Sequence, residues 1–430
     1  MDYPQTLHFL YNALPEFQQA GAGAYKPGLE RVGAFLRHLG DPQDNFRTIH
    51  IAGTNGKGST SHLLASALMA AGYRVGLYTS PHLRDFRERI RIDGQTISEQ
   101  VVVEFVACHR HAMRGLSFFE MTVGMAFECF RAAGVDVAVV ETGLGGRLDA
   151  TNVVTPILSV ITNIGLDHTA LLGDTIPQIA TEKAGIIKPG TPVVVGERGP
   201  ESDPVFEARA AKQGAPLLFA EDFYRCTGSE AWADRQTLHI ARWADGENFS
   251  MDLDLMGDYQ RKNIVTALTA VDVLNERTSL RIPPDATARG FASAECTTGL
   301  PGRWQKLGER PLVIADTGHN EHALRELMTQ IARHPYSKLY MVIGFSADKD
   351  VAAMLRLLPR GAYYIFTQSL SQRALPAVEL ARMAAAEGLA GEVAVTVPGA
   401  LARARALAAP EEMIFVGGST FVVADMDGNA

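Results

Sequence analysis

The stretch from Ile51 to Thr60, IAGTNGKGST, constrains the fold of this chain more than any other. It follows TIHIAG, an apolar run that predicts a strand, and it leads into STSHLLASALMAAG, which predicts a helix ending at Gly72. YRVGLYTS predicts the next strand. The three segments make a βαβ unit with a glycine loop between its first strand and its helix, which indicates an α/β fold with a mainly parallel sheet.

The glycine loop departs from the usual phosphate-binding pattern, because only Thr54 and Asn55 separate Gly53 from Gly56. Its place still favours phosphate, since a helix N-terminus after a buried strand presents backbone N–H groups and the positive end of the helix dipole. Lys57 adds a mobile cation, and the Ser59–Thr60 hydroxyls fall where a magnesium ligand would lie. A merely flexible turn is the alternative, but the loop's position predicts nucleotide binding.

Length and composition predict two domains in a chain of 430 residues with 47% hydrophobic content. The turn-rich stretch TTGLPGRWQ divides them, so we expect a nucleotide-binding domain over 1–297 and a second domain over 298–430. In the second, LVIADTGHN, LYMVIGFSADKD, YYIFTQ and MIFVGG each read as a strand running into a loop, with helices between them. That pattern predicts a smaller, Rossmann-like α/β domain.

Charge and cysteine usage exclude several classes of function. A formal net charge of -8 argues against a nucleic-acid or acidic-membrane binder, so an anionic ligand needs a locally basic pocket. The four cysteines form no CxxC pair, which speaks against a zinc ribbon or redox motif. No leader-like N-terminus and no apolar run of about 18 residues is present, so we expect a cytoplasmic protein.

Polar residues follow several of the predicted strands. Ser80 comes after YRVGLYT, Glu141 ends VDVAVVE, and His168 follows PILSVIT. Open α/β sheets gather ligands at the carboxyl ends of their strands, and a hydroxyl, a carboxylate and an imidazole there suit a hard cation bound to ATP phosphates. Taken singly, Glu141 reads as a solvated carboxylate and His168 as a structural histidine. Lys183, in TEKAGIIKPG, reads as a surface lysine paired with Glu182.

Several longer segments resemble the folylpolyglutamate synthases and the bifunctional dihydrofolate synthases. They occur in that family's order from about residue 28 to about residue 420, and they read HIAGTNGKGST, YTSPHL, RERIRIDG, ETGLGGRLDATN, LDHT, EKAGIIKPG, GRWQ, DTGHN and ADKD. The more distant Mur ligases share the loop and the histidine, glutamate and lysine, but they normally lack TSPHL and its ERIRI continuation.

The resemblance implies roles for the residues already noted. The ATP triphosphate would lie on Gly53, Thr54, Asn55, Gly56, Lys57, Gly58, Ser59 and Thr60. Ser80, Glu141 and His168 match magnesium ligands, and Lys183 matches a lysine carbamylated by carbon dioxide that helps to hold a second magnesium; a monovalent cation such as K⁺ is a further expectation. Contacts to adenine, phosphate or ribose, across a site between the domains, match Asn263, Arg303, Asp316 and His319. Lys57, Lys183 and His319 would be catalytic.

For the folate acceptor, the resemblance points to KPGLER (Lys26 to Arg31), FFEMT and LDA. The residues expected to frame dihydropteroate are Gly28, Leu29, Glu30, Arg31, Phe119, Glu120, Thr122, Leu148, Asp149 and Ala150. Phe118 and Phe119 could equally be core residues. The arginines of RDFRERIRID would attract glutamate carboxylates, with a solvated charged strand as the alternative. DTGHN departs from the commoner DGAHNP, which puts the glutamate-side loop geometry in doubt.

Together these features predict an ATP-dependent ligase that joins L-glutamate to dihydropteroate, forming dihydrofolate, or to a folate, lengthening its γ-linked glutamate chain. The expected intermediate is an acyl phosphate, and the expected partners are small molecules alone, with the protein a monomer. Three alternatives stay open: an enzyme restricted to polyglutamylation, a Mur-type ligase acting on a UDP-sugar peptide, and a nonenzymatic module that binds ATP.

Overall fold

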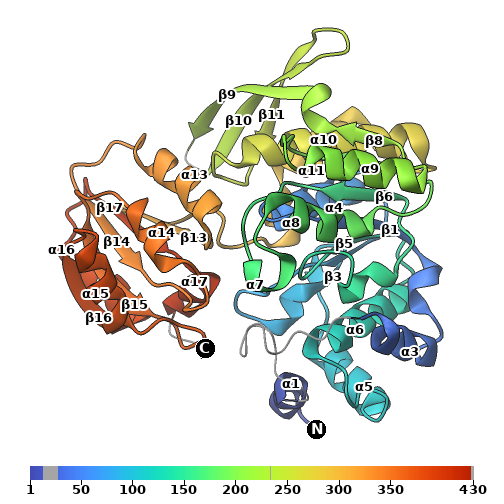
Figure 1. Cartoon of the computed structure of the whole chain (residues 1–430), viewed down its shortest axis with the longest axis horizontal. Helices are drawn as coiled ribbons and strands as arrows, with labels where there is room; N and C mark the ends of the chain where they lie inside the picture. The colour runs from blue at the N-terminus through green and yellow to red at the C-terminus, as the bar shows by residue number, and fades with distance from the viewer. Residues whose placement is uncertain (13–27, 233, 428–430) are drawn as a thin grey trace. The chain divides into compact units, whose positions relative to one another are not determined.

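The computed structural model describes residues 1–12, 28–232 and 234–427, and its contacts divide the chain into two compact units. The first unit runs from Met1 to Leu255 and continues over Tyr259–Leu300. The second comprises Met256–Asp258 and the chain from Pro301 onward. Each unit is described by itself below, with the elements labelled as in Figure 1.

An eight-stranded sheet in the order β4-β3-β2-β5-β1-β6-β7-β8 forms the centre of the first unit. The six strands from β2 to β8 in that order run parallel, and β3 and β4 add an antiparallel edge. The predicted mainly parallel sheet is therefore confirmed. The strands are β1 (Arg47–Ala52), β2 (Val75–Tyr78), β3 (Ile90–Ile92), β4 (Gln95–Thr96), β5 (Val137–Glu141), β6 (Leu158–Ile161), β7 (Val193–Val195) and β8 (Leu217–Phe219).

The central strands β1, β5 and β6 are apolar because both faces of the sheet are covered. On one face, Ile49, Ile51 and Val139 share a buried cluster with Leu63 and Leu68 of α4 (Lys57–Ala70). On the other face, Ala138 and Val140 join a cluster built largely from α6 (Phe118–Ala133). A helix buried on nearly all sides, as α4 is, fixes the loop that precedes it.

The remaining elements of the first unit surround this sheet (Figure 1). A separate antiparallel sheet has the order β11-β10-β9, from strands β9 (Tyr224–Trp232), β10 (Arg235–Arg242) and β11 (Asn248–Leu253). The α-helices are α1 (Tyr3–Asn12), α3 (Glu30–His38), α5 (Glu99–His109), α7 (Thr169–Leu172), α8 (Ile176–Lys183), α9 (Asp203–Gln213), α10 (Gln260–Arg277), α11 (Pro284–Ala292) and α12 (Ala294–Thr298). The 3-10 turns are η2 (Pro42–Asn45), η3 (Phe86–Arg89), η4 (Ala150–Val153), η5 (Ala184–Ile186) and η6 (Ala220–Asp222).

The second unit holds a six-stranded sheet in the order β12-β13-β17-β14-β15-β16, parallel except for β12. Its strands are β12 (Gln305–Glu309), β13 (Leu312–Asp316), β14 (Leu339–Ile343), β15 (Tyr363–Gln368), β16 (Gly391–Thr396) and β17 (Met413–Gly417). Its helices are α13 (Glu321–Ile331), α14 (Val351–Arg356), α15 (Ala377–Ala386), α16 (Val397–Leu407), α17 (Thr420–Ala424) and η7 (Asp425–Asp427). The four predicted strands are present, whereas the edge strands β12 and β16 escaped prediction because they lack a buried apolar run.

Within the described ranges, no helix combines the length and the apolar character that crossing a membrane requires.

Candidate functional site

Four neighbouring parallel strands of the first unit, in the order β2-β5-β1-β6, end at the same edge of the sheet. The glycine loop follows β1, Ser80 follows β2, Glu141 is the last residue of β5, and the segment containing His168 follows β6. Sequence segments far apart in the chain are thus gathered where parallel α/β sheets bind ligands.

The glycine loop is held in a shape that other residues could not adopt. Gly53 has φ 151° and Gly56 has φ 81°, both outside the range that L side chains prefer. A Cβ on Gly53 would overlap the Thr162 hydroxyl, and one on Gly56 would overlap the Asn263 side-chain amide. Gly56 is also the N-cap of α4. The first-turn N–H groups of that helix therefore have no partner within the helix and point toward the loop.

Two amides of the loop are already used within the protein. The Thr54 N–H donates to the main-chain oxygen of Asn163, and the Asn55 N–H donates to the Asn163 side-chain oxygen, each at 2.9 Å. The amides that remain for a phosphate therefore begin at Gly56. Sequence reasoning missed Asn163, which was detectable only as a polar residue two positions after the end of β6.

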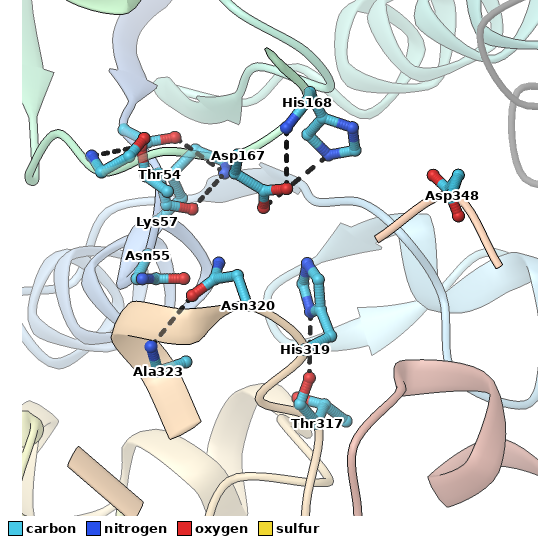
Figure 2. A network of polar contacts seen from close by, with 12 residues as sticks. Thr54, Asn55, Lys57, Asp167, His168, Thr317, His319, Asn320, Ala323 and Asp348 are labelled. Carbon is cyan, nitrogen blue, oxygen red and sulfur yellow. Dashed lines mark hydrogen bonds and ion pairs between the residues drawn. The ribbon is translucent and has the colours of Figure 1, made fainter. Parts of the chain in front are cut away.

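Lys57 and Lys183 meet at this loop. The Lys57 ammonium donates to the oxygens of Gly53 and Thr54 at 3.0 and 3.2 Å, the second contact lying at the upper left of Figure 2. The Lys183 ammonium, from the end of α8, donates to the same Gly53 oxygen at 2.8 Å. Burial, reinforced by the charge of Lys57, lowers the pKa of Lys183 to about 7.

The reading of Lys183 as a surface lysine is therefore wrong, since only 4% of the residue is exposed. Its expected partner Glu182 pairs instead with Arg147, at 2.8 Å. The physical reason is that α8 ends there and turns into η5, which carries the Lys183 side chain inward beneath the loop.

The predicted magnesium ligands include a buried carboxylate. Glu141 is 4% exposed, and its Oε2 accepts the Ser80 N–H at 3.4 Å, so these two residues are adjacent. His168 has φ 50°, and its ring lies beside Asp167, with Nε2 3.9 Å from Oδ2 (Figure 2). A search of the described residues for three or more grouped His, Cys, Asp and Glu side chains finds no metal-holding cluster.

The donor chemistry nevertheless fits a nucleotide-bound magnesium ion. Mg²⁺ is usually held by one or two protein oxygens together with phosphate oxygens and water, and it does not require a cage of protein carboxylates. The Ser80 hydroxyl and the buried Glu141 carboxylate supply oxygens of that kind at the edge where the phosphate loop lies.

Asn263 lies beside the loop from the first turn of α10. Its Oδ1 is against Gly56, and its Nδ2 donates to Gln260 Oε1 at 2.8 Å. Gln260 in turn donates to the Ser59 hydroxyl at 3.2 Å. This places Asn263 next to the phosphate loop, within the same unit as the loop.

The acceptor segments contain one ion pair between predicted residues. Arg31, in α3, lies 3.1 Å from Glu120, in the first turn of α6. Phe118 is buried among core aromatics, whereas the Phe119 ring lies against Gly143 of the ETGLGG segment. The Thr122 hydroxyl is 2.8 Å from the Tyr78 hydroxyl. Of the KPGLER residues, Gly28, Leu29, Glu30 and Arg31 are described, and Lys26 and Pro27 lie outside the described residues.

Asp149 is buried, and its carboxylate accepts hydrogen bonds from residues of its own segment. Its Oδ1 accepts from the Thr151 N–H at 3.0 Å and from the Thr151 hydroxyl at 2.5 Å, and its Oδ2 accepts from the Leu144 N–H at 2.8 Å. Burial raises its pKa despite these bonds. Leu148 and Ala150 flank it, half-buried and buried.

The arginines of RDFRERIRID are engaged within the first unit. Arg87 pairs with Asp85 at 2.7 Å. Arg89 is 2% exposed and donates to His82 at 2.6 Å, and Arg91 donates to the oxygens of Gly94 and Gly299. The alternative interpretation, that these arginines lie on a solvated charged strand, is therefore wrong for Arg89.

In the second unit, the predicted residues lie where β13 ends. Asp316 Oδ2 accepts from the Trp304 N–H at 2.7 Å, and Oδ1 accepts from the Gly318 N–H at 2.8 Å. Arg303 hydrogen-bonds to the Thr317 hydroxyl, and His319 Nδ1 lies 3.0 Å from the Thr317 oxygen (Figure 2). The departure at DTGHN thus gives Thr317 a hydroxyl that also bonds to the Gly302 oxygen, at 3.1 Å.

Comparison with known protein families assigns both units. Residues 51–271 match the Mur ligase middle domain, and residues 302–420 match the Mur ligase glutamate ligase domain. A dihydrofolate synthase/folylpolyglutamate synthase of Escherichia coli is 37% identical over 83% of this chain and 80% of its own length.

One relative is much longer than this chain. A protein of Haloferax volcanii named probable bifunctional folylpolyglutamate synthase/dihydropteroate synthase is 34% identical over 99% of the chain, which spans about half of that protein's length (50%).

Among solved structures, E. coli FolC in complex with DHPP and ADP matches with a TM-score of 0.85 and 33% identity, over 100% of this chain and 97% of that one. The likeness in sequence and in structure covers most of the chain. The chain belongs to the Mur ligase family, in its dihydrofolate synthase/folylpolyglutamate synthase branch.

Proposed function

We propose that this chain joins L-glutamate both to dihydropteroate and to reduced folates, at the expense of ATP. The observation that carries the proposal is the meeting of Lys57 and Lys183 on the Gly53 oxygen, in a loop that opens a helix N-terminus, at the sheet edge where the buried Glu141 carboxylate ends β5. Such a loop binds a triphosphate, and the Lys57 ammonium places positive charge where negative charge develops during phosphoryl transfer.

The chemistry divides between two steps. A carboxylate oxygen of the folate acceptor attacks the γ-phosphorus of ATP, and the bond between that phosphorus and the oxygen bridging to the β-phosphate breaks. ADP departs, and the folate carboxylate has become an acyl phosphate. The glutamate amine then attacks the activated carbonyl, loses a proton and expels inorganic phosphate, which leaves an amide. The protein must exclude water meanwhile, because an exposed acyl phosphate hydrolyses.

The proposal gives each residue of the first unit a task. The first-turn amides of α4 and the Lys57 ammonium would bind the β- and γ-phosphates, and Asn263 would bind the adenosine end beside Gly56. Ser80, Glu141 and His168, with a carbamylated Lys183, would hold magnesium, which when bound offsets the charge on the phosphates. A monovalent cation such as K⁺ and a monomeric protein belong to the same proposal.

The acceptor would lie against the segments around Arg31, Phe119 and Asp149. Support comes from their proximity to the phosphate loop: the segment that carries Asp149 packs on the turn that carries Lys183, through the Arg147 N–H, which donates to the Glu182 oxygen at 2.7 Å. For the second unit, we propose that Arg303, Asp316 and His319 contribute to nucleotide binding and that His319 is catalytic.

The test is ATP-dependent release of phosphate by the purified protein with magnesium and L-glutamate. Dihydropteroate, tetrahydrofolate and a UDP-MurNAc acceptor are compared in parallel, with Lys57→Ala as the loss-of-function variant and Lys212→Ala, on the exposed side of α9, as its matched control. Release with both folates, lost only in Lys57→Ala, is the expected result.

Other outcomes would change the proposal in defined ways. Release with tetrahydrofolate alone would restrict the enzyme to polyglutamylation and remove the dihydropteroate assignment. Release with the UDP-sugar alone would move the chain to a Mur-type amino-acid ligase. Silence with every acceptor would leave a nonenzymatic module that binds ATP.

A further inference from the structure

A histidine is buried at the centre of the main sheet. His50 lies in β1, where it pairs in register with Val140 of β5 and Ser159 of β6, and none of its surface is exposed. Because side chains alternate along a strand, it points away from the α4 face to which Ile49 and Ile51 point. A buried imidazole costs stability unless its polar atoms are bonded, so its partners show what it is for.

His50 begins a chain of hydrogen bonds that ends on Asp149. Its Nε2 lies 2.8 Å from the Thr151 hydroxyl. That hydroxyl donates to Asp149 Oδ1 at 2.5 Å, and the Thr151 N–H donates to the same oxygen at 3.0 Å. Three side chains from β1 and from the start of η4 are thus linked in one buried line.

The proton positions in this line follow from the donors available. A threonine hydroxyl has a single proton, and here that proton goes to Asp149. With Asp149 ionised, His50 Nε2 is the donor to the hydroxyl, and Nδ1 is the bare nitrogen of a neutral ring. Nδ1 has no hydrogen-bond partner among the described residues. Burial, with Lys188 as a second cause, lowers the pKa of His50 to about 3, which agrees with a neutral ring.

The same position could be filled more cheaply by an apolar residue if packing were the only requirement. Of its neighbours on this face, Ala138 and Val140 are apolar and fully buried, and the buried Ser159 bonds to the Ile186 oxygen. A donor at Nε2 instead satisfies the hydroxyl oxygen while the Thr151 proton faces Asp149, whereas an acceptor at this position would compete with Asp149 for that proton.

The orientation of the Asp149 carboxylate matters for binding of the folate acceptor. Asp149 is one of the residues proposed to contact dihydropteroate, and its segment is bound to the Lys183 turn through the Asn152 side-chain amide, which donates to the Gly185 oxygen at 3.2 Å. A small rotation of the Asp149 carboxylate would therefore move the carboxylate oxygen that is proposed to contact dihydropteroate. It would leave the phosphate loop undisturbed.

We propose that His50 is a positioning residue that holds the Asp149 carboxylate, through Thr151, in the orientation that binds the pterin-bearing acceptor. This rests on the proposed function, because it assigns Asp149 to the acceptor and Lys57 to the nucleotide. His50 itself touches neither substrate. Its effect is on acceptor binding and leaves ATP binding alone.

The experiment compares His50→Leu with His50→Gln. Leucine removes the donor, whereas the glutamine side-chain amide can place an N–H near the position of Nε2. We expect His50→Leu to raise KM for dihydropteroate by about tenfold, as the loss of one buried hydrogen bond allows, while KM for ATP changes by less than about twofold. His50→Gln should recover most of the loss.

Two further variants keep the test decisive if His50→Leu folds poorly. Thr151→Val breaks the chain at its middle and should show the same split between the two KM values, with Thr151→Ser as its rescue. Ser159→Ala is the matched control, because it removes a buried hydrogen bond, to the Ile186 oxygen at 2.8 Å, from the neighbouring strand without touching Asp149. It should leave the ratio of the two KM values unchanged.

The results separate failure of the inference from failure of the proposed function. Normal wild-type turnover of dihydropteroate, with equal changes of both KM values or no change in His50→Leu and Thr151→Val, would overturn the role of His50 alone. Absence of wild-type turnover with dihydropteroate, despite turnover with tetrahydrofolate, would remove the dihydropteroate assignment and this inference together.

Discussion

Lys57 and Lys183 donate to one and the same acceptor, the main-chain oxygen of Gly53, at 3.0 and 2.8 Å. Burial removes water from the Lys183 ammonium, and the nearby Lys57 charge adds repulsion. The pKa of Lys183 therefore falls from 10.5 to about 7. At neutral pH a large part of this side chain is then an unprotonated amine, the form that reacts with carbon dioxide.

Replacing Lys183 should reveal the free-energy cost of its buried ammonium group, because that cost makes the stability of the protein depend on pH. Below pH 7 the folded and unfolded states both carry the proton, so the full cost of the buried charge is present. Between pH 7 and 10.5 the folded state releases the proton first, and the cost declines. In buffer free of carbon dioxide, Lys183→Met should be more stable than the wild type at pH 6, by about 1 kcal/mol or more, and the difference should shrink towards pH 10.

Thermal unfolding at several pH values measures that difference. Lys212→Met, which changes an exposed lysine of α9, is the control and should show no such trend. A gap between Lys183→Met and the wild type that stays constant from pH 6 to pH 10 would show that the amine is not destabilised by burial.

Gly53→Ala should damage the phosphate loop. The added methyl group would collide with the Thr162 hydroxyl, and φ 151° is strained for alanine, so the loop must move by displacing β1 from β6. We expect weaker ATP binding by about tenfold or more, since strain of this kind costs on the order of 1–3 kcal/mol. Calorimetric titration with ATP measures it. Gly361→Ala, an exposed glycine with open space around its Cβ position, should bind as the wild type does.

Asn163→Ala should loosen the loop without removing any group that meets the nucleotide. The Asn163 side chain accepts the Asn55 N–H at 2.9 Å and donates to Glu197 at 2.8 Å, and Glu197 lies 3.0 Å from Lys262. We expect KM for ATP to rise by about three- to tenfold, as the loss of one or two hydrogen bonds implies. Steady-state kinetics check this, with Asn248→Ala, at the exposed first position of β11, as the control. An effect on KM for the folate acceptor alone would contradict the assignment.

Glu295→Gln should stabilise the protein at alkaline pH. Burial, with Asp254 as a second cause, raises the pKa of Glu295 to about 7 from 4.5. The folded state therefore holds this proton more tightly than the unfolded state, and stability falls as pH rises from 4.5 to 7 and stays lower above it. Glutamine should add about 1 kcal/mol at pH 8 and little at pH 4, after allowance for partial solvent exposure.

Melting temperatures of the wild type and Glu295→Gln at those two pH values give the answer. Glu411→Gln, which neutralises an exposed carboxylate of the second unit, serves as the comparison for simple loss of charge. Equal stabilisation at pH 4 and pH 8 would count against a buried charged carboxylate.

Local sequence patterns predicted the elements around the loop well. TIHIAG and STSHLLASALMAAG became β1 and α4, because strand burial and helix periodicity depend on residues close in sequence. The burial of Lys183 depends on contacts with residues distant in sequence. Nothing in TEKAGIIKPG indicates that its ammonium lies under the oxygen of Gly53, 130 residues away in sequence. Only the family resemblance gave this lysine a role in the site.

Asn163 and Asp149 show the same limit from the other side. The pairing of β1 with β6 brings Asn163 to the loop, and sequence periodicity does not specify which strands become neighbours. Asp149 was expected on the acceptor side, a role that stays a prediction, but its bonds to Leu144 and Thr151 and the link to His50 depend on packing between β1 and η4. Sequence identifies such residues, and three-dimensional packing assigns their partners.

The anchoring of Thr54 and Asn55 to Asn163 has a consequence for how quickly and how tightly a nucleotide can be held. A loop that is already fixed by the adjoining strand loses little conformational entropy when a phosphate arrives, because that loss was incurred when the chain folded. We therefore expect the unliganded and liganded forms of residues 53–56 to share one backbone trace. Association should then be limited by encounter, with no slow step in which the loop itself rearranges.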